Sequence, residues 1–361
     1  MIARSGRSRT VPPVPWCTAV ACALLAAASV LLAAACTRRA PTQEIQLFAW
    51  SEYVPEEVTD GFTAETGIRV NVETFASNEE MLAKLLSGAV HYDVVQPSDY
   101  VVEALAREGR LQPIDPAKIP RLRDVSPDFL HLPFDPEQRW TIPWMGGTVG
   151  IVVNSERVPP ESIRSFADVF TEAHRGRIVV VDDPREIVSW ALATEGLPIN
   201  GMDEASLVKV EPLLRKWIPL VRVFDSDSPK TALLDGDVDL GVVWSGEGAL
   251  LLDEDPKFRW ILPAEGAHRF VDSLAIPSDA RNPEGAHRFL DWVLRPEVSA
   301  RVSGAYPYTN PNLAARRLLS PRQLANPASY PPGEAKLEFF RDVGAAAVAV
   351  DQLVARIKAG G

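Results

Sequence analysis

The chain has 361 residues, of which 46% are hydrophobic and 24% charged, and its formal net charge is −11. This composition excludes a disordered tail, a collagen-like fibre and a disulfide-stapled mini-domain. It also excludes a polytopic membrane protein, because only one stretch is long and apolar enough to span a bilayer. The length favours about two domains. The acidic balance argues against nucleic acid as a partner and suits either a cationic ligand or simple solubility.

The first 36 residues predict an export leader. Arginines without any acidic residue precede an uncharged run over residues 16–35, and three alanines at 33–35 come directly before Cys36. This pattern resembles the lipobox of a lipoprotein, in which Cys36 becomes the lipidated first mature residue. The alternatives are an Ala-x-Ala site for an ordinary secretory signal and an uncleaved N-terminal anchor. All three place the folded part outside the cytoplasm, in the periplasm or at the extracytoplasmic face of the membrane.

Reactive side chains do not form a recognisable catalytic or metal motif. All three cysteines lie in the leader, so the mature chain has no disulfide, thiolate nucleophile or cysteine metal site. The sequence contains no nucleophile elbow, zinc-protease motif or phosphate-binding glycine loop. The histidines have no metal-ligand spacing, and we interpret each as a surface or core residue: His91, His131, His174, His268 and His287. We therefore expect neither an enzyme nor a resident metal or cofactor.

Strands and helices alternate in the first half of the mature chain. Ser77 opens a helix with a capping-box pattern, and we expect Met81, Leu82, Leu85 and Leu86 to point inward from it. Gly67 and Gly88 end two of the helices. The pattern predicts strands over 43–49, 68–74 and 92–96, and helices over 55–66, 77–87 and up to Arg107.

The second half repeats this rhythm after crossing strands over residues 140–153. It predicts strands over 177–181, 221–224, 238–244 and 260–262. Two helices are expected to start at residues 165 and 182, and two more to span 207–217 and 342–358. Pro212 should kink the helix over 207–217. Such βα spacing is typical of parallel sheets covered by helices. Two such units imply two lobes, with a ligand cleft at the carboxyl ends of the strands.

Acidic and aromatic residues recur together at the predicted strand ends, and lysine is absent from them. The strand ends are residues 50–53, 97–100, 182–186, 244–247 and 270–273. A cleft of this kind suits an elongated organic cation, because carboxylates pair with ammonium groups and aromatic faces cover the methylene stem. Each cation–π contact adds about 0.5–2 kcal/mol.

Structural roles explain the same residues without a ligand. Asp183 and Glu186 fit a capping box of a helix that begins at Pro184. Trp50 and Trp244 suit a hydrophobic core equally well, and Tyr53 and Tyr100 suit a surface edge. Asp272 follows apolar residues, so a purely structural hydrogen bond is its alternative role.

Several segments together resemble the periplasmic spermidine/putrescine-binding proteins of ABC importers. They follow the same order over almost the whole mature chain, at 50–55, 62–68, 77–79, 93–98, 182–186, 272–277, 311–316 and 342–345. The resemblance implies an α/β, two-lobed periplasmic-binding-protein fold of type II. Each lobe would be a mixed, mostly parallel sheet flanked by helices, with the ligand cleft between the lobes. It implies capture of spermidine or putrescine, delivery to the permease subunits, no chemistry on the ligand, and a monomer.

The resemblance also implies a set of ligand-binding residues. Trp50 and Trp244 correspond to its aromatic walls, Asp183 and Glu186 to an acidic pair that holds one amine, and Asp272 to a central carboxylate that holds an inner amine. Tyr306 is a possible substitute for Tyr308, because the loop differs. The full set is Trp50, Ser51, Glu52, Tyr53, Ser98, Tyr100, Asp183, Glu186, Ser226, Trp244, Phe270, Asp272 and Tyr308.

Two departures from the family pattern leave the preferred chain length open: Phe270 replaces a tryptophan and Phe340 replaces a glutamine. Discrimination between a diamine and a triamine depends on such contacts. Asp99 also stands where the family pattern has a threonine. Alternative functions are a polyamine sensor and a metal or iron-anion binder of similar fold, which would need a Tyr or His cluster. The approximate lobe boundaries that we predict are 37–148 with 271–317, and 149–270 with 318–361.

Overall fold

A computed structural model describes residues 43–51, 53–333 and 335–360. The predicted leader, with Cys36, lies outside these residues, and so does Glu52. Within the described part of the chain, no helix is long and apolar enough to cross a membrane. One compact unit of the chain begins at Gln43.

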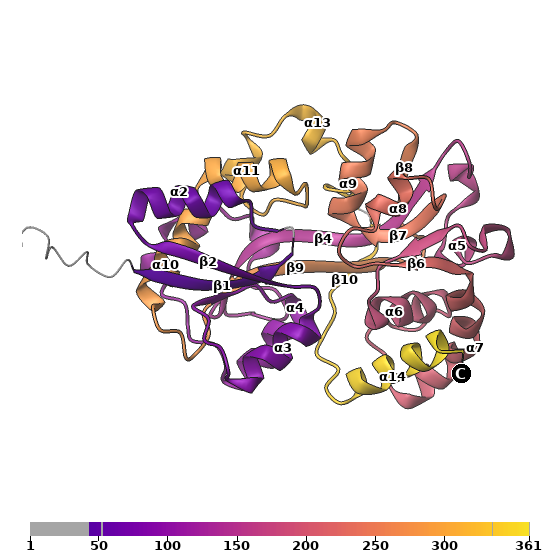
Figure 1. Ribbon diagram of the computed structural model, residues 1–361, viewed down its shortest axis with the longest axis horizontal. Helices are drawn as coiled ribbons and strands as arrows, with labels where there is room; N and C mark the ends of the chain where they lie inside the picture. The colour runs from indigo at the N-terminus through magenta and orange to yellow at the C-terminus, as the bar shows by residue number, and fades with distance from the viewer. Residues whose placement is uncertain (1–42, 52, 334, 361) are drawn as a thin grey trace, which may run out of the picture. The chain divides into compact units, whose positions relative to one another are not determined.

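Ten strands form one sheet in the described part of the chain (Figure 1). They are neighbours in the order β2-β1-β3-β9-β4-β7-β5-β6, while β10 pairs with β9 and β8 pairs with β4. The strands are β1 (Glu44–Trp50), β2 (Arg69–Phe75), β3 (Val94–Val95), β4 (Thr141–Asn154), β5 (Ile178–Val180), β6 (Val221–Phe224), β7 (Leu240–Trp244), β8 (Phe258–Ile261), β9 (Ala267–Ala275) and β10 (Leu337–Glu338).

Strand directions agree with two βα units joined by a crossing segment. β1 is parallel to β2 and β3, and β5 is parallel to β6 and β7. β4 and β9 run antiparallel to each other through the middle of the sheet. The predicted crossing strands are one strand of 14 residues, β4, and all of its residues are buried. Burial on both faces removes the alternation that would have shown its length.

Helices cover the sheet near both ends of the β4–β9 pair. In Figure 1, α2, α3 and α10 lie around one end, and α6, α7 and α14 lie around the other. α7 continues through Pro212 as a single helix. The helices are α2 (Glu56–Thr66), α3 (Asn78–Ser87), α4 (Asp99–Arg107), α5 (Phe166–Val169), α6 (Pro184–Thr194), α7 (Glu204–Trp217), α8 (Lys230–Leu234), α9 (Ser245–Glu254), α10 (Pro283–Val293), α11 (Pro296–Ala305), α12 (Leu313–Arg316), α13 (Pro321–Leu324) and α14 (Ala346–Lys358), beside short 3₁₀ helices such as Pro120–Asp124.

Local sequence signals place α2 and α3 as predicted, with one error. Gly67 ends α2 in the left-handed conformation, at φ 72°, which glycine adopts without steric cost. The Ser77 hydroxyl accepts a hydrogen bond from the Glu80 amide and so caps α3. The prediction that Leu86 points inward is wrong, because its side chain is 48% exposed. With about 3.6 residues per turn, Leu86 lies beyond the arc of the helix that Met81, Leu82 and Leu85 share, and only those three pack against the core.

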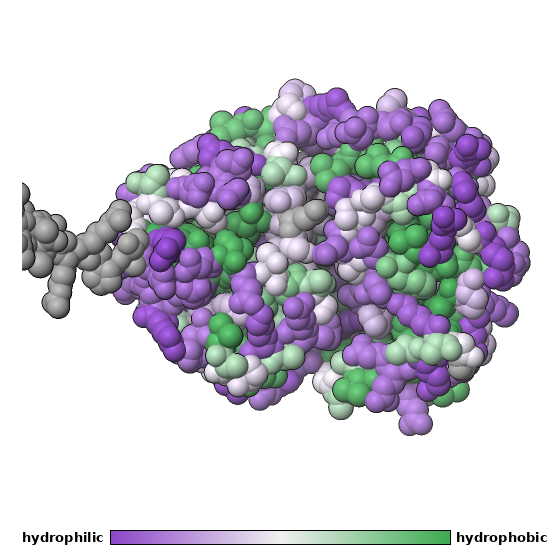
Figure 2. All heavy atoms as spheres, in the orientation of Figure 1, coloured by the Kyte–Doolittle hydropathy of each residue, from purple (hydrophilic) through white to green (hydrophobic). Residues whose placement is uncertain are grey.

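Buried apolar side chains form two large clusters, which are the cores of the two lobes. The first contains Phe48, Phe62 and Phe289, and the second contains Trp190 and Trp217. Along β4, the first cluster ends at Met145 and the second begins at Val149, so this strand passes from one core to the other. Figure 2 shows hydrophilic and hydrophobic residues interspersed on one face of the described residues.

Candidate ligand-binding site

A pocket lies where strands of both lobes end, and its empty space, which includes the open solvent at its mouth, is about 770 Å³. Trp50 and Ser51 at the end of β1 and Ser98 after β3 line one side. Asp183 after β5 and Trp244 at the end of β7 line the other. We call this cavity the central pocket. Its position agrees with the rule that ligands of α/β sheets bind at the carboxyl ends of strands.

The central pocket gathers every predicted ligand-binding residue that the structure describes; Glu52 lies outside the described residues. The predicted residues that line the pocket are Trp50, Ser51, Tyr53, Ser98, Tyr100, Asp183, Glu186, Ser226, Trp244, Phe270, Asp272 and Tyr308. Their contact with a ligand stays a prediction, but their convergence from distant segments on one cavity is a property of the fold.

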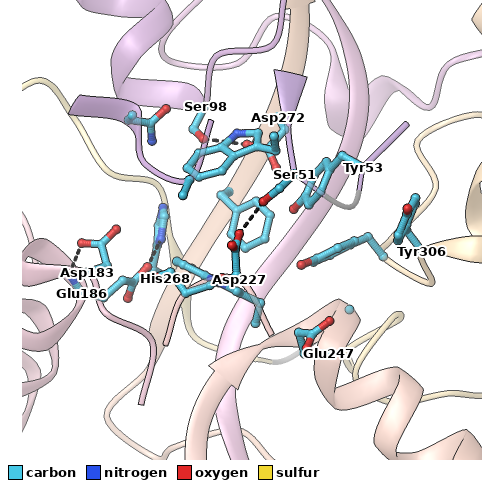
Figure 3. A pocket seen from close by; sticks show the side chains of 18 of the residues that line it. Ser51, Tyr53, Ser98, Asp183, Glu186, Asp227, Glu247, His268, Asp272 and Tyr306 are labelled. Carbon is cyan, nitrogen blue, oxygen red and sulfur yellow. Dashed lines mark hydrogen bonds and ion pairs between the residues drawn. The ribbon is translucent and has the colours of Figure 1, made fainter. Parts of the chain in front are cut away.

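Asp272 is a buried carboxylate on β9 that faces this pocket (Figure 3). Its side chain is 2% exposed, and its Oδ1 accepts a 2.6 Å hydrogen bond from the Ser98 hydroxyl. The Tyr53 hydroxyl also hydrogen-bonds to it. Burial raises the pKa of Asp272 to about 7, although these two hydrogen bonds act in the opposite direction. The structural hydrogen bond that we considered as an alternative role of Asp272 is therefore present. Both donors are neutral hydroxyls, so they do not neutralise the negative charge of the ionised carboxylate.

Asp183 caps α6 at another side of the pocket. Its Oδ1 accepts hydrogen bonds from the backbone amides of Arg185, at 2.9 Å, and Glu186, at 3.1 Å. Burial, and next the nearby charge of Glu186, raises the pKa of Asp183 to about 7. Capping and pocket lining therefore coexist in this residue, as local rules allow.

Glu186 does not complete the predicted capping box. Its Oε2 accepts a 3.1 Å hydrogen bond from the Trp190 indole, and its Oε1 lies 2.6 Å from Nδ1 of His268. A carboxylate at the third helical position closes such a box only when it turns back to the capping residue. Here a buried histidine attracts it instead.

His268 is the main pocket residue that the sequence analysis missed. It lines the pocket beside Glu186, and its Nε2 lies 3.3 Å from Oδ2 of Asp99. Burial lowers the pKa of His268, but the Glu186 and Asp99 carboxylates outweigh burial and raise it to about 9. The imidazole is therefore protonated at neutral pH, and each ring nitrogen donates to a carboxylate.

Aromatic rings form much of the pocket wall. The centroid of Trp244 lies 5.6 Å from that of Phe270, and the centroid of Tyr53 lies 5.1 Å from that of Tyr308. Trp50 and Trp244 are half-buried, pack against the cores and line the pocket. The core and pocket-wall interpretations of these two tryptophans are thus compatible.

Two further acidic residues line the pocket. Asp227 follows β6, and its carboxylate accepts a hydrogen bond from the Ser51 hydroxyl across the cavity (Figure 3). Glu247 on α9 pairs with Lys230, with 2.9 Å between Oε1 and Nζ. Carboxylates from both lobes therefore line the pocket. The described residues hold no group of three or more His, Cys, Asp or Glu side chains arranged for a metal ion.

Comparison with known proteins gives the family. Residues 48–300 match the family described as bacterial extracellular solute-binding protein. The chain belongs to this family. It is 36% identical over 342 residues to the spermidine/putrescine-binding periplasmic protein of Escherichia coli, covering 93% of this chain and 98% of the relative. It is 34% identical to the spermidine/putrescine-binding periplasmic protein 1 of Haemophilus influenzae, covering 89% of this chain and 90% of the relative.

A solved structure shares the fold of this solute-binding protein. The spermidine/putrescine ABC transporter substrate-binding protein of Streptococcus pneumoniae superposes with a TM-score of 0.75 and 30% identity, covering 88% of this chain and 99% of that one. These comparisons confirm the two-lobed α/β fold and the predicted family.

The pocket residues that sequence reasoning missed carried a readable signal. His268, Phe270 and Asp272 alternate along β9, so their side chains share one face of the strand. Asp227 follows the end of β6, and ligands of α/β sheets bind at such strand ends. Glu247 belongs to the strand-end segment 244–247, which the sequence analysis assigns to the cleft without naming this residue as a ligand contact. Applying the period of two to all three β9 residues would have placed His268 in the pocket.

Proposed function

We propose that this solute-binding protein captures a polyamine outside the cytoplasm and delivers it to the permease subunits of an ABC importer. The relatives from Escherichia coli and Haemophilus influenzae are named for spermidine and putrescine and for the periplasm. The chemistry of the central pocket supports the same ligand class, independently of those names.

The buried carboxylate of Asp272 is the observation that carries this proposal. It lies 2% exposed between the hydroxyls of Ser98 and Tyr53, with a pKa raised to about 7 by burial. Holding an ionised carboxylate there is costly unless a cation joins it. An ammonium group bound at Asp272 offsets that cost and restores the ionised form.

Aromatic rings supply the second element of polyamine recognition. Trp244, Phe270 and Tyr308 line the same pocket as this carboxylate. Their faces can cover methylene groups and attract the adjacent ammonium groups, each contact contributing about 0.5–2 kcal/mol. A neutral solute of the same length would gain the first contribution but not the second.

The remaining predictions belong to the same proposal. We infer that the thirteen residues predicted from the sequence, including Glu52, contact the polyamine. We also infer that the lobes have the predicted boundaries, that they close on the ligand, and that the protein is a monomer. We also infer that Cys36 carries the lipid anchor. The protein binds and releases its ligand without chemical change.

Isothermal titration calorimetry of the purified mature protein tests the proposal. We expect saturable one-to-one binding of putrescine, of spermidine or of both, and no binding of 1,4-butanediol, which has the carbon chain of putrescine without its charges. The absence of heat and of thermal stabilisation with both polyamines would overturn the proposal. Equal binding of the diol would show that charge does not drive recognition.

A further inference from the structure

The pocket already contains a cation of its own. His268 lies at the Asp183–Glu186 side of the central pocket, apart from Tyr53 and Tyr306 (Figure 3). Its Nδ1 is 2.6 Å from Glu186 Oε1 and its Nε2 is 3.3 Å from Asp99 Oδ2. The side chain is 5% exposed. Because α4 carries Asp99 and α6 carries Glu186, the imidazole joins carboxylates from two helices.

Other side chains fix this imidazole in place. The Phe340 ring stacks on it, with centroids 3.7 Å apart and planes inclined by 15°. The Arg185 guanidinium lies 4.3 Å from the Phe340 centroid and 4.3 Å from that of Tyr100. Each of these two cations, His268 and Arg185, therefore has an aromatic contact.

Each oxygen of the two carboxylates beside His268 already has a partner within the protein. Both oxygens of Glu186 are engaged, by His268 and by the Trp190 indole. Asp99 accepts from the Tyr100 amide through Oδ1 and faces His268 through Oδ2. Asp183 remains, but it already caps α6 with one oxygen.

Asp272 and Asp227 differ from the carboxylates at this end of the pocket. Their side-chain donors are neutral hydroxyls, such as those of Ser98 and Ser51, and neither carboxylate has an ion pair within 4.0 Å among the described residues. His268 and Asp272 are four residues apart on the same face of β9, which separates their backbones by about 13 Å. One end of the pocket thus already holds an imidazolium beside Glu186, whereas Asp272 and Asp227 have only neutral side-chain donors.

We propose that His268 is a specificity-determining residue: its imidazolium replaces one ammonium group of the ligand at Glu186 and Asp99, so the pocket selects short diamines over longer triamines. This inference rests on the proposed polyamine function and narrows it. A triamine must bring a further ammonium toward the imidazolium, where the carboxylates are already paired. That ammonium would be desolvated beside a like charge, which is unfavourable.

The test compares putrescine and spermidine by calorimetry on the same protein preparations. We expect the wild-type protein to bind putrescine at least tenfold more tightly than spermidine. His268→Gln retains one amide donor for Glu186 but removes the charge, and it should shift this ratio toward spermidine by tenfold or more. His287→Gln is the matched control, because His287 is also 5% exposed but lies on α10, outside the residues that line the pocket. It should leave the ratio unchanged.

The outcomes separate this inference from the function on which it rests. Binding of neither polyamine overturns both. If wild-type protein binds spermidine as tightly as putrescine, or more tightly, the role of His268 is overturned but polyamine capture is not. This outcome does not depend on whether any variant folds. An unchanged ratio in folded His268→Gln also overturns it. Phe340→Ala, which removes the stack while keeping the imidazole, should relax the ratio in the same direction by a smaller factor.

Discussion

The hydroxyl of Ser51, at the end of β1, donates a hydrogen bond to the carboxylate of Asp227, which follows β6. The two residues are 176 positions apart and belong to opposite walls of the central pocket. In a two-lobed fold, such a bond forms only when the lobes are near each other, so it favours the closed arrangement.

Ser51→Ala should therefore weaken ligand binding by about three- to tenfold, since a typical intramolecular hydrogen bond contributes about 0.5–1.5 kcal/mol net. Calorimetry gives the affinity, and small-angle scattering should show that the ligand-free variant is more expanded than the wild type. Ser87→Ala is the control, because Ser87 is exposed and donates only to the Lys84 carbonyl on α3. An unchanged affinity for Ser51→Ala would contradict the role of this bond in closure.

Gly246 keeps space for the Tyr308 ring. A Cβ at this position would lie 2.4 Å from two atoms of that ring, so Gly246→Ala must displace it. We expect affinity for the polyamine to fall by about tenfold, because one aromatic contact contributes about 0.5–2 kcal/mol.

Gly304→Ala is the matched control for this substitution. Gly304 lies in α11, and a Cβ added there would have no heavy atom of another residue within 4 Å apart from its own helix backbone and chain neighbours. Alanine should therefore stabilise the helix by about 0.5–1 kcal/mol without affecting binding. Calorimetry and thermal denaturation distinguish the two variants. Wild-type affinity in Gly246→Ala would show that Tyr308 does not contact the ligand.

Ligand binding should release protons near neutral pH. Burial raises the pKa of both Asp183 and Asp272 to about 7, so each carboxyl is partly protonated in the ligand-free protein at that pH. An ammonium bound at Asp272 favours the ionised form of that carboxyl and lowers its pKa. Affinity should therefore rise from about pH 5.5 to 7.5 and then level off. Calorimetry at pH 6.5 in buffers of different ionisation enthalpy measures the number of protons released on binding. If no protons are released and the affinity is constant from about pH 5.5 to 7.5, the prediction is contradicted.

The pH dependence of stability should show the charge of His268. Its pKa rises from 6.5 in the unfolded chain to about 9 in the folded protein, because Glu186 and Asp99 outweigh its burial. The protonated imidazole thus stabilises the fold fully below about pH 6.5, and this contribution declines as the pH rises through 9. Ligand-free wild-type protein should lose more thermal stability over this interval than His268→Gln. Parallel curves for the two proteins would argue against a buried imidazolium.

The sequence was sufficient for the fold and for much of the pocket, because both follow from local patterns. Periodicity and glycine stops defined α2, α3 and their strands, and strand ends indicated where a ligand should bind. The sequence did not show the full length of β4, because a strand that is buried on both faces has no alternation of polar and apolar residues. The pairing of Glu186 with His268 joins residues 82 positions apart, so no local rule could show that Glu186 turns away from its capping box.

The affinity of Asp272→Asn for its polyamine tests the central claim most directly. Removing one partner of a buried ion pair costs about 3–5 kcal/mol, so calorimetry should show at least a hundredfold weaker binding. The melting temperature of ligand-free Asp272→Asn should stay within a few degrees of that of the wild type, because the lost carboxylate was unfavourable when ionised. Asp60→Asn is the control, since Asp60 is exposed, and it should match the wild type in affinity and melting temperature. Folded Asp272→Asn that binds within tenfold of wild type would contradict the account.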